Sequence, residues 1–137
     1  MGKRNLLLGI GGIFGSLLDM FLTYLVIVLT LALKSCVGEN GDTSGLEIVA
    51  SIICIVLIFS IVASIITSIR ALAGRKVPLV YIIVQQVVHV VIAVALIFSS
   101  LDNTDNLFMI IIAALCLLHF IIYVFGLIKQ KKNFKIE

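Results

Sequence analysis

Apolar residues occupy four long runs along this chain, separated by short polar segments. The runs cover residues 6–33, 48–69, 77–100 and 107–128, and Asp19 is the one formal charge inside them. Each run is longer than the about 18 residues that an α-helix needs to cross a bilayer. The pattern predicts an all-α polytopic membrane protein, with four transmembrane helices in an antiparallel bundle and a single membrane domain over residues 1–137.

Composition supports a membrane domain. Hydrophobic residues make up 62% of the chain and the mean hydropathy is +1.30. A soluble domain is typically about half apolar. The polar segments that remain are too short to build a core of their own. Any chemistry is therefore expected between the helices or at the mouth of a loop.

Basic residues gather on one side of the predicted membrane. Segments 3–4, 70–76 and 129–137 hold nine of the ten Lys and Arg residues, while segments 34–47 and 101–106 hold five acids and one lysine. Lys and Arg near the ends of spans are retained in the cytoplasm. We expect a multi-pass protein of the cell membrane with both termini cytoplasmic, and its Ile-rich, Trp-free composition favours a bacterial source. The basic residues indicate topology, so we expect no nucleic-acid partner.

The sequence carries no motif of an enzyme or a cofactor site. Its cysteines, Cys36, Cys54 and Cys116, form no CxxC pair. No nucleophile-turn motif and no glycine-rich phosphate loop is present. Cys116 and His119 are three residues apart, but no paired-ligand motif accompanies them. We therefore expect no catalytic activity, no cofactor and no metal.

Polar residues gather near the middle of three runs. Asp19, His89 and His119 each lie close to the midpoint of their run, and Gln85 and Gln86 are spaced to share a helix face with His89. Ionisable groups at the bilayer centre are costly and begin as functional candidates. Two interpretations stay open. The group binds or relays a proton or cation, or it forms a hydrogen-bonded network that fixes the helix register.

Small residues recur at a spacing of four on the first two runs. Gly11 and Gly15 form a GxxxG pair that continues to Asp19, and Ser60 and Ser64 repeat the spacing on the second run. Small residues allow the backbones of membrane helices to approach closely. These positions are predicted to be helix-packing sites.

Four spans in a little over a hundred residues, with an acid in the first, make this chain resemble the small multidrug exporters. The resemblance is an analogy of architecture. The chain departs from that family because it lacks tryptophan, which the family uses in the pocket beside its acid. Segment 34–47 is also longer than the short loops of that family. The strong charge bias opposes insertion of the chain in both orientations.

The combined features favour a small accessory or regulatory membrane protein. Short loops, the lack of a soluble domain and the small-residue seams indicate helix–helix contact with a larger membrane protein or with copies of itself. The alternative is a small proton- or cation-coupled transporter that uses the Asp/His layer. In both cases the lipid bilayer is a partner.

Overall fold

The all-α prediction is confirmed by the computed structural model, which describes residues 3–38, 40–101 and 107–134. Its helices are α1 (Leu6–Val37), α2 (Ser44–Leu72), α3 (Leu79–Leu101) and α4 (Leu107–Asn133). All four are long and apolar enough to cross a membrane. This supports a multi-pass membrane protein.

The helices extend beyond most of the predicted apolar runs. α1 continues to Val37, α2 begins at Ser44, and α4 ends at Asn133. Polar side chains do not interrupt the backbone hydrogen bonding of a helix, so the helices continue into the polar residues that flank the apolar runs. The first connection therefore spans residues 38–43 rather than 34–47. In this connection, hydrogen bonds from the side chain and backbone N–H of Ser44 lower the pKa of the Asp42 carboxyl.

Polar groups and a glycine define the helix ends near the chain termini. The Asn5 side chain caps α1 by accepting from the Leu8 N–H at 3.2 Å. After α2, Gly74 adopts φ 71°, and its N–H and that of Arg75 bond back into the last turn, as in a Schellman motif. The Gln130 amide binds both backbone groups of Val77, just before α3.

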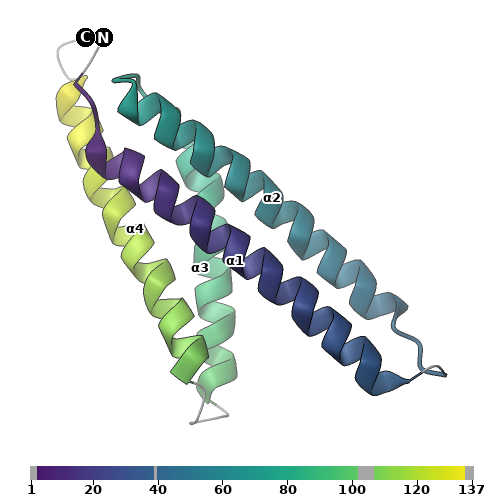
Figure 1. Ribbon diagram of the computed structural model, residues 1–137. Coiled ribbons are helices and arrows are strands. Elements are labelled where there is room, and N and C mark those ends of the chain that lie inside the picture. Colours follow the sequence, from purple (N-terminus) through teal and green to yellow (C-terminus); the bar gives the residue numbers. More distant parts are fainter. Residues whose placement is uncertain (1–2, 39, 102–106, 135–137) are drawn as a thin grey trace.

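Two helical hairpins form the molecule, α1 with α2 and α3 with α4 (Figure 1). The described chain begins and ends at one end, where the Asn133 side chain reaches the Lys3 carbonyl at 3.5 Å. We call this the terminal end and the opposite one the distal end. The hairpins cross obliquely and separate toward the distal end (Figure 1).

The interior has two apolar clusters on either side of a polar region. Leu8, Ala71, Val77, Ile82 and Tyr123 form the cluster near the terminal end. Leu18, Leu22, Leu57, Ala93, Ile112 and Cys116 form the distal cluster. The outer surface is rich in large apolar side chains, including Phe59, Phe98 and Leu107, each about two-thirds exposed. Such a surface suits lipid, because soluble monomers rarely expose large apolar patches.

Candidate functional site

Between the two apolar clusters, a set of polar side chains from all four helices is completely buried. Its members, which we call the polar core, are Asp19, Ser60, Ser64, Thr67, Gln85, His89, His119 and Tyr123, each 0% exposed. Buried polar groups are stable only when they are hydrogen-bonded.

Asp19 joins three helices. Its Oδ1 lies 2.5 Å from Nε2 of His89 on α3, and its Oδ2 accepts a hydrogen bond from the Ser60 hydroxyl on α2, also at 2.5 Å. An unpaired charge at the bilayer centre costs about 2.5–3.5 kcal/mol on insertion scales. The imidazole and the hydroxyl offset part of that cost for Asp19.

His119 does not contact Asp19 through a hydrogen bond. Its Nε2 lies 3.0 Å from the Gly11 carbonyl, which can only accept, so Nε2 carries the proton. Its Nδ1 lies 3.2 Å from the amide nitrogen of Gln86, which donates to it. Both ring nitrogens are therefore satisfied in neutral His119. The His119 ring also meets the His89 ring edge to face, with centroids 4.5 Å apart.

Glycines on α1 make this approach possible. A Cβ at Gly15 would lie 2.5 Å from His119 Nε2, and one at Gly11 would lie 2.7 Å from Cε1 of Tyr123. Because both positions lack a side chain, the α4 rings reach the α1 backbone. The GxxxG pair therefore packs against α4 of the same chain.

Gln85 is the centre of a second set of hydrogen bonds. Its Oε1 accepts from the hydroxyls of Ser64, at 2.8 Å, and Tyr123. Its Nε2 donates to Thr67 Oγ1 at 3.0 Å and to the Tyr81 carbonyl at 2.9 Å. Gln85 thus connects α3 to both α2 and α4.

The structure brings all five residues of the predicted polar layer into one region but divides them by role. Asp19 and His89 form one pair, His119 and Gln86 form another, and Gln85 binds a different set of partners. The predicted packing residues Gly11, Gly15, Ser60 and Ser64 are buried between this chain's own helices. Their faces are therefore not available to a partner helix.

Sequence reasoning missed several members of the network. Tyr123 and Thr67 are not among the residues predicted for the polar layer, although both bind Gln85. Asn5 and Gln130 were also missed, although both stand at the ends of apolar runs where a polar side chain can reach backbone groups. The Asn5 amide donates to the Gly126 carbonyl at 2.8 Å.

Buried polar side chains lie on one side of the Asp19–His89 pair. In the described chain, the other buried polar residues all lie between this pair and the terminal end. On α1 they precede Asp19, on α2 they follow Ser60, and on α3 they precede His89. On α4 they are His119 and residues that follow it. Toward the distal end, the core consists of the apolar cluster around Leu22 and Leu57. The polar groups therefore reach from mid-molecule to one end only.

Where the hairpins separate, an apolar cleft of about 350 Å³ opens at the distal end. All four helices line it, with residues that include Leu29 of α1, Ile53 of α2, Ile92 of α3 and Phe108 of α4. Its volume lies within the range of ligand pockets, about 300–1,000 Å³. The cleft lies beyond the polar core, whose residues are not part of its lining.

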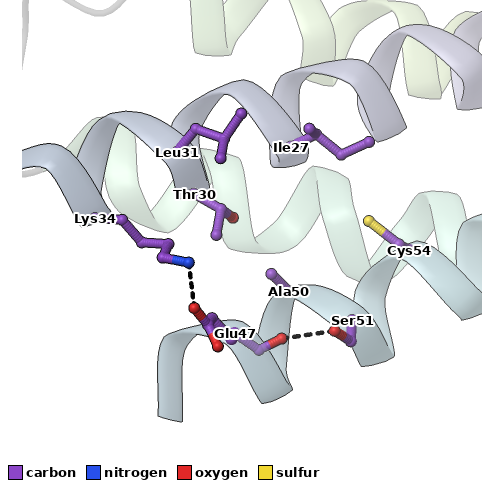
Figure 2. A pocket seen from close by; sticks show the side chains of 8 residues that line it. All are labelled: Ile27, Thr30, Leu31, Lys34, Glu47, Ala50, Ser51 and Cys54. Atoms are coloured by element: carbon purple, nitrogen blue, oxygen red, sulfur yellow. Dashed lines mark hydrogen bonds and ion pairs between the residues drawn. The ribbon is translucent and has the colours of Figure 1, made fainter. Parts of the chain in front are cut away.

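A second hollow, of about 370 Å³, lies between α1 and α2 near their distal ends. Figure 2 shows Lys34 of α1 reaching the carboxylate of Glu47 on α2 across this groove. The small residues Ala50, Ser51 and Cys54 form its α2 wall (Figure 2). The distal half of the α1–α2 hairpin is thus hollowed on two separate faces, since the cleft and the groove share no lining residue.

Comparison with protein-family models, curated proteins and solved structures finds no match for this chain. Among the residues that the structure describes, no group of three or more His, Cys, Asp or Glu side chains could hold a metal ion. The functional argument therefore depends on the chain's own geometry.

Proposed function

We propose that this chain is an accessory membrane protein that holds a transmembrane helix of a larger membrane protein against its distal half. The apolar cleft between the separated hairpins carries the proposal. Its lining is apolar, and side chains from all four helices contribute to it. The charge bias of the loops favours a cell-membrane protein with cytoplasmic termini, so the cleft would lie in the outer leaflet.

A larger partner fits these observations better than a second copy of the chain. The glycine and serine seams that commonly join identical membrane helices are buried within the monomer. By contrast, the small residues Ala50, Ser51 and Cys54 line an open groove on another face of the α1–α2 hairpin. The cleft is lined by apolar side chains from all four helices, so apolar side chains of a single partner helix could enter it.

Photocrosslinking in intact membranes tests this function with a matched pair of positions. Leu29 lines the cleft and is 59% exposed, whereas Leu17, on the same helix, is 60% exposed and lies outside both hollows. A photoreactive residue at Leu29 should give a protein adduct, while the same residue at Leu17 should give lipid adducts. Lipid adducts alone at both positions, or an adduct of twice the chain's mass at Leu29, would contradict the proposal.

A proton- or cation-coupled transporter is the second candidate. The buried Asp19–His89 pair favours it, because such pairs are typical of intramembrane proton relays. Purified protein in liposomes should then catalyse a pH-driven flux that Asp19→Asn abolishes while the protein still folds. Among the described residues, however, buried polar side chains lie on only one side of the pair, and the core toward the distal end is apolar. A transporter needs a polar path on both sides, so the accessory function is the stronger candidate.

A further inference from the structure

Two buried side-chain atoms find no hydrogen-bond partner among the described residues, and both belong to α3. They are Nδ1 of His89 and Oε1 of Gln86. These two residues are three apart, so their side chains are neighbours on one face of the helix. Both also contact His119, one through its ring and the other through its amide. Unpartnered buried polar atoms require an explanation.

Counting protons on the Asp19–His89 pair gives that explanation. When the pair carries one negative charge, Asp19 is a carboxylate, His89 donates from Nε2, and Nδ1 has only a lone pair. When the pair takes up one proton from the aqueous phase, it becomes neutral and Nδ1 carries a hydrogen. This holds whichever side of the short Asp19–His89 bond the shared proton occupies.

The neutral state creates a donor at Nδ1 of His89. An unused buried acceptor, the side-chain oxygen of Gln86, lies three residues earlier on the same helix face, and the two atoms are not hydrogen-bonded in this structure. A neutral pair also avoids a net charge at the bilayer centre, which is costly. His119 is a poorer proton acceptor than the Asp19–His89 pair. The Gly11 carbonyl and the Gln86 side-chain NH2 group already bind both nitrogens of its neutral ring.

We propose that Asp19 and His89 together form a proton-binding site, in which the side-chain carbonyl of Gln86 accepts the hydrogen bond from Nδ1–H of His89. The site is incomplete without Gln86. Its side-chain NH2 group donates to Nδ1 of neutral His119, and its side-chain oxygen accepts from Nδ1–H of His89. This proposal does not depend on the accessory function and holds whether or not a partner helix binds.

Other titratable groups around His89 come from two helices. α1 contributes Asp19, and α4 contributes His119, Tyr123 and Cys116. From α2, the polar-core residues are all hydroxyl-bearing: Ser60, Ser64 and Thr67. Asp19 is the one carboxyl in the polar core, so removing it removes the negative charge that the proton neutralises.

Nitrogen-15 NMR of histidine-labelled protein in bilayers tests the site directly. Between about pH 5 and pH 8, His89 should carry a hydrogen on Nδ1, either throughout or below a single midpoint, while His119 stays neutral. A His89 whose Nδ1 remains unprotonated at every pH in that range would overturn the proposal. So would a doubly protonated His119, since the proton would then lie on the other ring.

Two variants test the roles of the partners. Gln86→Leu should weaken proton binding at His89 about tenfold, because the new N–H is left without an acceptor. Val90→Leu, a lipid-exposed change on the same helix, is the matched control and should leave it unchanged. Proton binding in Gln86→Leu that equals the wild-type value would refute the assigned acceptor.

Asp19→Asn should lower the proton affinity of His89 about a hundredfold or more, because the protonated ring would then carry an uncompensated charge in the membrane. The His119 resonances report whether this variant keeps its fold. If it does not fold, the wild-type spectra and the Gln86→Leu comparison still decide the question. An unchanged affinity in a folded Asp19→Asn protein would overturn the paired site.

Discussion

Gly12 offers a sharp test of how closely α1 and α2 approach. A Cβ at Gly12 would lie 2.7 Å from the backbone oxygen of Ser64 and 2.9 Å from the backbone nitrogen of Ser68. These are main-chain atoms of α2, so they cannot move aside as the end of a flexible side chain can. Gly12→Ala therefore forces the two helices apart.

The magnitude follows from three effects. Overpacking by one methyl group costs about 1–3 kcal/mol. Separation of the helices also weakens the nearby hydrogen bond from Ser68 Oγ to the Gly9 carbonyl, 2.9 Å long, and such bonds in membranes contribute about 0.6 kcal/mol. Alanine recovers about 1 kcal/mol through its higher helix propensity. Gly12→Ala should thus destabilise the protein by about 0.5–2.5 kcal/mol.

Gly45→Ala is the matched control, because a Cβ there meets nothing within 4 Å. It should leave stability unchanged or raise it by up to about 1 kcal/mol. Reversible unfolding in bilayers or mild detergent, with each variant compared with the wild type, measures the free-energy difference. If Gly12→Ala proved as stable as Gly45→Ala, the close approach of α1 and α2 would be refuted.

Two further predictions concern the glutamines. Gln85→Leu loses three side-chain hydrogen bonds to α2 and α4 and should lower the free energy of unfolding by about 2 kcal/mol. At a pH where the Asp19–His89 site holds no added proton, Gln86→Leu loses one bond, to His119, and should cost about 0.6 kcal/mol. Equal effects on unfolding under these conditions would contradict the central place of Gln85. Gln130→Leu leaves both backbone groups of Val77 without their side-chain partner, so hydrogen exchange at the Val77 amide should accelerate. Unchanged protection of this amide would show that the contact does not hold the start of α3.

The number and type of elements could be predicted from sequence because the bilayer allows few alternatives. Backbone polar groups in hydrocarbon must bond within the chain, so four long apolar runs predict four helices. The common depth of Asp19, His89 and His119 also followed from simple spacing. Their pairing did not, because Gln85 and Gln86 both lie within one turn of His89 and only the rotation of α3 decides which of them binds His119.

The separation of the hairpins was not predictable from the same pattern. Spacing of small residues indicates a close contact but not its crossing angle, and it does not reveal which helix makes the contact. Gly11 and Gly15 therefore suggested a seam for a partner, whereas the structure places them against Tyr123 and His119 of α4. The cleft depends on that geometry and had no separate signal in the sequence.

Residue accessibility across the membrane tests the central claim, that the chain crosses the bilayer an even number of times with its basic side in the cytoplasm. Cys36 is exposed at the distal end of α1, and Arg75 lies in the connection at the terminal end. A membrane-impermeant thiol reagent should label Cys36 in intact cells. It should label an Arg75→Cys, Cys36→Ser protein only after the membrane is permeabilised. Labelling of both positions from the same side of an intact membrane would contradict the account.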